Sequence, residues 1–176
     1  MAGSLIKINE AIVTTATPSV TLTGIDSTYD VYQLVISNYQ SVSSQFISMR
    51  VTESGTANDT ANYDYAYKYF KSALAFANSY NSNQTATLLT ATVGDTTTNS
   101  AYNGNVSSYL FNFNNASEYS FFTFESTQNE TGGTVVGIQG GGVFTSTSSC
   151  DGVYIFGGNS YNFTGNFTLY GLKKIL

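Results

Sequence analysis

Residues 46–52 read Phe-Ile-Ser-Met-Arg-Val-Thr, and from Ile47 onward apolar and polar side chains alternate. Ile47, Met49 and Val51 fall on one side of an extended chain, with hydroxyl and guanidinium side chains between them. A period of two is typical of a β-strand with one face buried, because successive side chains of a strand point to opposite faces. The stretch therefore predicts a strand whose apolar side faces a core.

Other runs of strand-forming residues follow the same logic, and clusters of Gly, Asn, Asp or Ser separate them. These runs lie at residues 5–12, 20–22, 31–36, 109–114, 119–125, 134–139, 152–156 and 167–172. In the first run Ile6, Ile8 and Ile12 share one face. The run 31–36 is apolar on both faces apart from Gln33, which predicts a central strand covered on both sides.

Residues 63–78 carry two signals. Tyr63, Tyr65, Tyr67 and Tyr69 alternate with other residues, which predicts a strand. Residues 71–77 contain good helix formers, which favour one or two helical turns. We therefore predict a strand for the first half and leave the second half open between helix and strand.

Eight to ten short strands predict an all-β, single-domain β-sandwich. A jelly roll is the form we expect first, with another Greek-key sandwich as the alternative. No linker divides the chain, so we assign residues 1–176 to one domain, with residues 1–4 as a short N-terminal tail. The following residues are predicted to be buried: Ile6, Ile8, Val35, Ile47, Met49, Val51, Phe111, Phe113, Phe122, Phe124, Val153, Ile155, Phe167 and Leu169.

Charge and composition exclude several classes of function. Only 10% of the 176 residues are charged, the net charge is −5, and six residues are basic. A nucleic-acid site needs a basic surface, so we expect no nucleic-acid partner. No signal peptide and no membrane-spanning apolar run is present. We therefore expect cytosolic synthesis and no membrane insertion.

Nothing in the sequence predicts an enzyme. Histidine is absent, which removes Ser-His-Asp and Cys-His nucleophile systems. The single Cys150 lacks a cationic neighbour that would lower its pKa. Glu118 and Glu125 flank an aromatic run, but their odd separation places them on opposite faces of one strand. The glycine run 140–142 is followed by no Lys-Ser or Lys-Thr, so we interpret it as strand backbone and not as a phosphate loop.

Aspartates offer one ion hypothesis. We expect no cofactor or metal, but Asp26 and Asp30 flank a turn and provide the hard oxygen ligands that calcium prefers. If the protein binds a metal, the sequence predicts calcium at these two residues. Turn-capping is the ordinary role of such aspartates.

Several segments together resemble a group of bacteriophage virion proteins labelled structural or tail-fibre-like, found in marine and other environmental phages. The segments that carry the resemblance are residues 21–32, 49–52, 63–68, 109–121 and 165–174. The resemblance extends from about Leu5 to Lys174. It implies a virion structural protein, made in the cytoplasm of the host bacterium and located in the particle.

Two functions remain open within that class. The first is a capsid decoration (cement) protein that docks on other virion proteins, such as the major capsid protein or tail proteins. The alternative is a receptor-binding tail-fibre tip, or a lectin-like module, that binds bacterial surface glycan. A single domain beginning by about Leu5 favours decoration, because a fibre tip normally follows a stalk. A surface poor in charge and rich in Tyr and Phe predicts self-association as a homotrimer.

The predicted binding surface lies in the tyrosine-rich segment. Tyr63, Tyr65 and Tyr67, with Asn62 and Asp64 beside them, combine aromatic rings with amide and carboxylate groups. Such amphipathic side chains are common where proteins bind sugars or other proteins.

Overall fold

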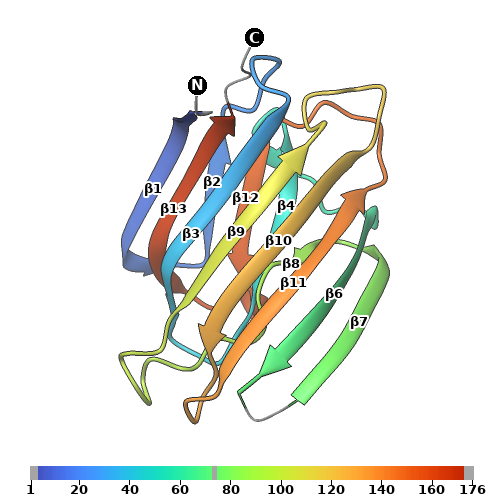
Figure 1. The fold of residues 1–176 in the computed structure, drawn as a ribbon. Helices are drawn as coiled ribbons and strands as arrows, with labels where there is room; N and C mark the ends of the chain where they lie inside the picture. Colours follow the sequence, from blue (N-terminus) through green and yellow to red (C-terminus); the bar gives the residue numbers. More distant parts are fainter. Residues whose placement is uncertain (1–3, 73–74, 173–176) are drawn as a thin grey trace.

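The computed structural model describes residues 4–172 except 73–74. It is an all-β sandwich of two antiparallel sheets, as predicted (Figure 1). The expected jelly-roll form is not established by the strand order and stays a prediction. Residues 1–3 of the expected tail, Ala73 and Leu74 of the ambiguous segment, and Lys173 and Lys174 of the terminal block lie outside the described residues.

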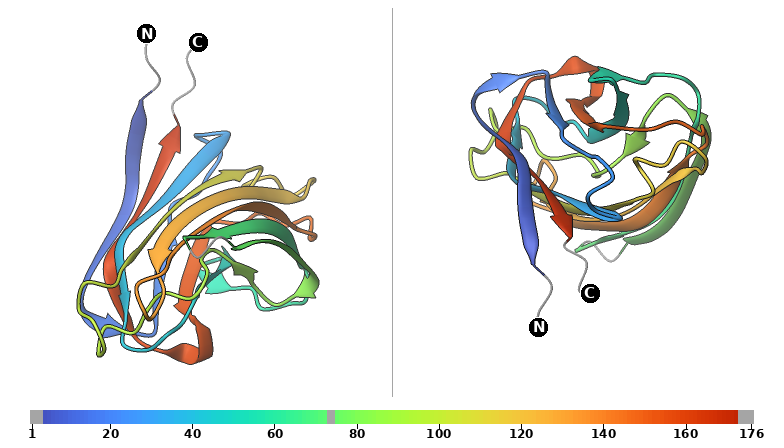
Figure 2. Two further views of the ribbon diagram at one scale, coloured as in Figure 1. Left: turned by 60° about the horizontal axis from the view of Figure 1, so that its bottom comes forward. Right: turned by 90° about the horizontal axis from the view of Figure 1, so that it is seen from above.

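The large sheet has eight strands, which lie side by side and define one continuous curved layer (Figures 1 and 2). Their order is β1 (Leu5–Thr17), β13 (Phe163–Leu172), β3 (Val31–Ser41), β9 (Gly104–Phe111), β10 (Ser120–Asn129), β11 (Val135–Phe144), β6 (Tyr63–Lys71) and β7 (Ala75–Gln84). The edge strands are therefore β1 and β7.

The small sheet packs against the inner face of the large one (Figure 2). Its order is β2 (Ser19–Thr23), β12 (Gly152–Gly157), β4 (Ile47–Glu53) and β5 (Thr56–Ala57), and β8 (Thr87–Leu88) also pairs with β4. A short 3-10 turn, η1 (Gly158–Ser160), follows β12. The small sheet thus supplies the second layer that the apolar faces require.

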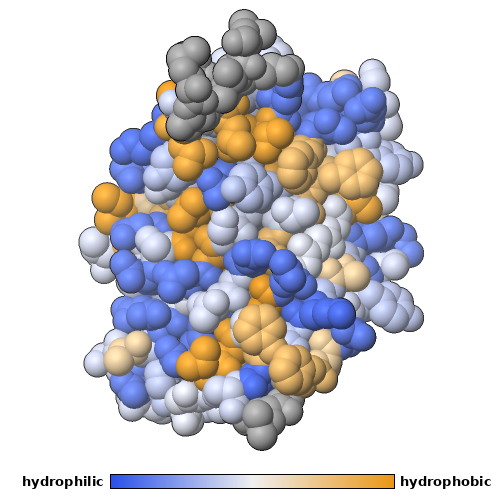
Figure 3. All heavy atoms as spheres, in the orientation of Figure 1, coloured by the Kyte–Doolittle hydropathy of each residue, from blue (hydrophilic) through white to orange (hydrophobic). Residues whose placement is uncertain are grey.

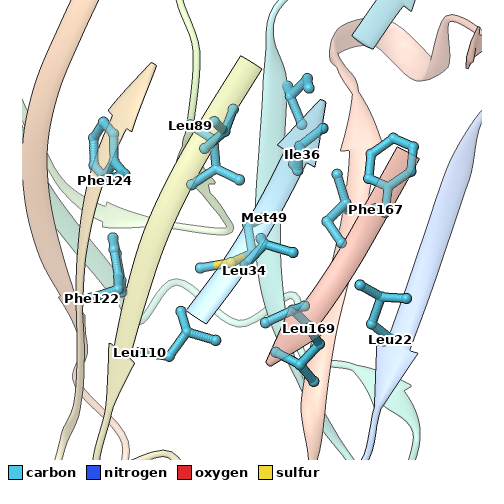
Figure 4. Packing of buried hydrophobic residues seen from close by; sticks show 14 of the residues in the cluster. Leu22, Leu34, Ile36, Met49, Leu89, Leu110, Phe122, Phe124, Phe167 and Leu169 are labelled. Carbon is cyan, nitrogen blue, oxygen red and sulfur yellow. The ribbon is translucent and has the colours of Figure 1, made fainter. Parts of the chain in front are cut away.

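The core lies between the sheets, where inward-pointing side chains of alternating positions meet (Figure 4). Met49 of β4 packs among Leu34, Leu110 and Leu169 of the large sheet in this cluster. The predicted core residues that are confirmed as buried are Ile47, Met49, Val51, Phe113, Phe122, Phe124, Val153, Ile155, Phe167 and Leu169.

Strand β1 corrects the first run. Ile6 was predicted to be buried and is 39% exposed, and Ile12 is also exposed. The register between β1 and β13 shifts between Lys7 and Asn9, which makes Ile8 the extra residue of a bulge. Ile8 is half-buried and packs against the core. Beyond the bulge Ala11 and Val13 pack against the core in place of Ile12. Ile6 lies before the bulge, where it pairs with Gly171 near the start of β1.

Val35 and Phe111 were also predicted to be buried and are only half-buried. Both point to the outer face of the large sheet, because their neighbours Leu34, Ile36 and Leu110 point inward. β3 is central within its sheet, as predicted, but a second layer covers only one of its faces. The prediction of a strand covered on both sides was wrong for that reason.

Strand β6 confirms the first half of the ambiguous segment, and residues 75–78 of its second half also lie in a strand. Residues 75–84 form β7, which pairs antiparallel with β6 along its length. Hydrogen bonding to a neighbouring strand overrides the modest helix propensity of 71–77. The sheet consequently ends in a long edge strand beside the tyrosines.

Candidate functional site

Alternation along β6 places its four tyrosines on the inner face of the large sheet. Tyr63 is fully buried, whereas Tyr65, Tyr67 and Tyr69 are half-buried. β6 contacts the short strand β8, and only its first residue, Tyr63, is hydrogen-bonded to the longer strand β4. The space between the sheets is consequently less filled beside β6.

A cleft of about 380 Å³ opens at this place, and we call it the tyrosine cleft. One wall carries Tyr65, Tyr67 and Tyr69. The rest of its lining consists of Phe46, Ser48, Lys71, Leu88, Thr90, Ala91, Thr92 and Glu130. The cleft thus combines aromatic and aliphatic surface with several hydroxyl groups, a composition suited to binding.

Glycines of β11 permit the tyrosines to lie where they do. Gly140 pairs with Tyr67 and with Phe124 on its two sides. A Cβ at Gly140 would lie 2.6 Å from the Cβ of Tyr67 and 2.7 Å from the Phe124 ring. The glycine run therefore serves close packing within a strand, as the sequence predicted.

The two central tyrosines form a stack. The ring centroids of Tyr65 and Tyr67 lie 6.3 Å apart with an interplanar angle of 16°. Burial raises the pKa of Tyr65, and the neighbouring Tyr67 raises it further. The Tyr65 phenol accordingly stays neutral at physiological pH and acts as an uncharged hydrogen-bonding group.

An ion pair closes one end of the cleft. The Lys71 Nζ donates to both carboxylate oxygens of Glu130, at 2.9 and 2.8 Å. The same ammonium lies 5.6 Å from the ring centroid of Tyr69. Because these two charges neutralise each other, the cleft presents no net charge to a ligand. It is suited to aromatic, apolar or neutral polar groups.

Of the five predicted binding residues, Tyr65 and Tyr67 reach the cleft and Tyr63 does not. The Tyr63 ring is fully buried and packs on Phe144, with ring centroids 4.9 Å apart. Its hydroxyl donates to the carbonyl of Asn58 at 2.8 Å. Tyr63 is therefore a core residue that anchors β6.

Asn62 and Asp64 support the surrounding backbone. The Asn62 side-chain amide donates to the Thr60 hydroxyl, and its backbone carbonyl accepts from the N–H of Thr145 at 2.8 Å. The Asp64 carboxylate accepts from the backbone N–H of Asn83 at 2.7 Å. Asp64 points away from the cleft, because it alternates with the inward tyrosines.

Sequence reasoning missed part of the cleft. Tyr69 continues the same alternation and could have been included on that signal alone. Phe46, Leu88 and Thr90 come from the other side of the sandwich, and no local pattern links them to β6. Only the packing of the two sheets identifies them.

Asp26 acts as a turn cap. Its carboxylate accepts from the Thr28 backbone N–H at 2.8 Å and from the Tyr32 hydroxyl at 3.0 Å. These hydrogen bonds, the one to the Thr28 backbone first, lower the pKa of Asp26. Asp30 also has an interaction partner. Within residues 4–172 apart from 73–74, no group of three or more Cys, Asp or Glu side chains is placed to hold a metal ion.

The remaining chemical candidates lie apart from one another. Cys150 is buried, and burial raises the pKa of its thiol to about 11. Glu118 accepts from the Asn112 side chain in a loop, and Glu125 accepts from Gln139 on the large sheet. Each carboxylate has its own neutral partner, and neither lines the tyrosine cleft.

Over the described part of the chain, no helix is long and apolar enough to span a membrane. No protein-family model matches the chain, and no curated protein matches it significantly. The geometry of the molecule and the resemblance noted in the sequence are therefore the grounds for a functional proposal.

Proposed function

We propose that this protein is a bacteriophage virion structural protein that decorates the outer surface of the capsid. The observation that carries the proposal is the tyrosine cleft, a neutral aromatic opening between the sheets that is suited to a protein partner. The resemblance to phage virion proteins supports the assignment to the particle. The partner in this proposal is another virion protein, the major capsid protein first.

The chemistry of the cleft favours a protein segment as its occupant. Protein interfaces are enriched in aromatic residues and depleted of charge at their centre. Tyr65, Tyr67 and Tyr69 supply rings with hydroxyl groups, and the paired Lys71 and Glu130 lie at one end as a polar rim. An apolar side chain of the partner would fill the cleft, while the hydroxyls bond its backbone.

Strand β7 adds a second contact element beside the cleft. It is the edge of the large sheet, and its ten residues include no charged side chain and no proline. Phe76 is 82% exposed on it. Edge strands of monomers are usually protected by charge or by bulges, and β1 has both, namely the Lys7–Glu10 pair and its bulge. β7 also shifts register near its end, between Asn81 and Gln84, but it carries no charge, so it is the edge that we assign to subunit contact.

The decisive experiment is the copy number in purified particles, measured by quantitative mass spectrometry. Decoration predicts hundreds of copies. A few copies located at the tail would contradict it and support a receptor-binding tail-fibre tip.

A rebinding assay tests the role of the cleft. Particles lacking the protein are incubated with wild type, Tyr67→Ser or Tyr161→Ser. Tyr161 is 42% exposed and does not line the cleft, which makes it the matched control. We expect Tyr67→Ser to lose binding and Tyr161→Ser to retain it. If both variants bind the particles equally well, the cleft is not part of the docking surface.

A further inference from the structure

Two hollows lie next to each other on the outer face of the large sheet, on the side opposite the tyrosine cleft. The first, about 340 Å³, is lined by Tyr109, Thr123, Glu125 and Gln139, among others. The second, about 590 Å³, is lined by Ala66, Tyr67, Lys68, Asn78, Ser79, Tyr80 and again Gln139. Figure 3 shows that apolar and hydrophilic side chains are interspersed over this face. Because Gln139 lines both hollows, we treat them as one feature and call it the outer trough.

Strand register explains the shape of the outer trough. Across β9, β10, β11, β6 and β7 the paired residues are Tyr109, Thr123, Gly141, Ala66 and Tyr80. The three central residues are small, and the two at the ends are tyrosines, 39% and 80% exposed. Four inter-strand spacings separate the tyrosines, which is about 19 Å. The row is therefore a low floor between two aromatic ends.

Gly141 marks the floor as a place of close approach. On the outer face a Cβ at Gly137, further along β11, would meet the Phe70 ring, whereas Gly140 and Gly142 alternate with Gly141 and face the core. At Gly141 the three atoms nearest a Cβ position are the Phe122 carbonyl oxygen at 2.9 Å and the Cα and Cγ2 of Thr123, both at 3.7 Å. Glycine inside a strand weakens it and often marks close approach by a ligand. None of those three nearest atoms belongs to an aromatic ring.

A row of polar side chains borders the floor. Glu125, Gln139, Lys68 and Asn78 are paired across β10, β11, β6 and β7, and all four are exposed. Gln139 Nε2 donates to Glu125 Oε1 at 2.8 Å, which holds both side chains in place. The row offers an ammonium and amides as donors, and a carboxylate as acceptor. One positive and one negative charge leave it with no net charge.

We propose that the outer trough binds a neutral linear oligosaccharide. Sugar rings have apolar C–H faces that pack on aromatic side chains, and hydroxyl groups at their edges that bond to amides and carboxylates. The balanced charge of the trough and the net charge of −5 suit a neutral ligand and disfavour a polyanion. A linear chain fits better than a single sugar, because the two tyrosines lie at opposite ends of the floor. This site goes beyond the proposed docking role of the tyrosine cleft.

The test is isothermal titration calorimetry of the folded protein with cellotetraose, maltotetraose and chitotetraose. We expect at least one of them to bind with a Kd of about 1 mM or tighter. Tyr109→Ala and Tyr80→Ala should each weaken that binding at least about tenfold. Tyr161→Ala, an exposed tyrosine outside the trough, should leave it unchanged. Tyr69→Ser, at a residue that lines the tyrosine cleft and neither hollow, should also leave it unchanged, which separates this site from the docking cleft.

Three results would overturn the proposal. One is the absence of binding by all three sugars, with the fold verified by circular dichroism. Another is binding that the Tyr109 and Tyr80 variants do not weaken. The third is tighter binding of an alginate tetrasaccharide than of the neutral sugars, because a polyanion does not match the balanced charge around Lys68 and Glu125.

Discussion

The hydroxyl of Tyr63 accepts a hydrogen bond from the backbone N–H of Val51 at 3.0 Å, and this contact ties the large sheet to the small one. The same hydroxyl donates to the Asn58 carbonyl at 2.8 Å. Tyr63, the most deeply buried tyrosine of β6, thus fixes the distance between β6 and β4. The tyrosine cleft opens between these two strands.

Tyr63→Phe should lower the free energy of unfolding by about 1–3 kcal/mol, because it leaves the N–H of Val51 and the carbonyl of Asn58 without that partner. Urea denaturation monitored by circular dichroism measures the change. Tyr161→Phe is the control, since removal of an exposed hydroxyl should change the free energy of unfolding by less than about 0.5 kcal/mol. Equal stability of the two variants would show that the buried hydroxyl does not tie the sheets together.

Alkaline pH should destabilise the protein through its buried tyrosines. Burial raises the pKa of both Tyr39 and Tyr63 well above the ordinary value of about 10. A group whose pKa is raised on folding stabilises the protein fully below its unfolded pKa, and that contribution is lost as pH rises toward the folded pKa. The free energy of unfolding should therefore fall once pH exceeds about 10. Tyr63→Phe should make that fall less steep; a wild-type stability independent of pH in this range would contradict the argument.

Phe113→Ala should lower the free energy of unfolding by about 3–5 kcal/mol, through lost burial and a residual cavity. Its ring is 2% exposed and belongs to the core cluster. Cys150→Ser is the contrasting variant and should change the melting temperature by only a few degrees, because the hydroxyls of Ser120 and Ser148 lie 3.8 and 4.0 Å from the sulfur. Thermal denaturation of both variants measures the two effects. A larger loss of stability for Cys150→Ser than for Phe113→Ala would contradict the prediction.

A chelator such as EDTA should leave the melting temperature within a few degrees, because the Asp26 carboxylate is occupied by Thr28 and Tyr32. Its lowered pKa means that these bonds stabilise the fold above the ordinary carboxyl pKa and are lost as pH falls through the lowered value. A large drop in melting temperature on chelation would instead identify Asp26 and Asp30 as calcium ligands.

Self-association as a trimer is the expected state in solution. Exposed Phe76 lies on the uncharged edge strand β7, a combination typical of subunit contacts. Light scattering coupled to size exclusion should give three times the chain mass of 18.9 kDa. Phe76→Lys should shift the mass toward the monomer. A monomeric wild type at micromolar concentration, with no contact between copies in the particle, would contradict the expectation.

Much of the fold could be predicted because alternation is a local property. The period of two around Met49 and Phe122 identified buried faces without knowledge of the strand partners. The predictions failed where a non-local feature intervened. A bulge at Ile8 turned Ile12 to the outer face, and the absence of a layer over the outer face left Val35 half-buried.

The sequence by itself determined the β character of the chain and the shared face of Tyr65 and Tyr67, because side-chain direction follows from position along a strand. Tertiary structure alone decided what those faces meet. The tyrosine cleft requires β6 to lie opposite Leu88, and the outer trough requires Tyr109 and Tyr80 to fall in one row across five strands. That row depends on the pairing of β11 with β6, which joins segments far apart in the chain. Such pairing is selected by the packing of the whole sandwich, and no local pattern records it.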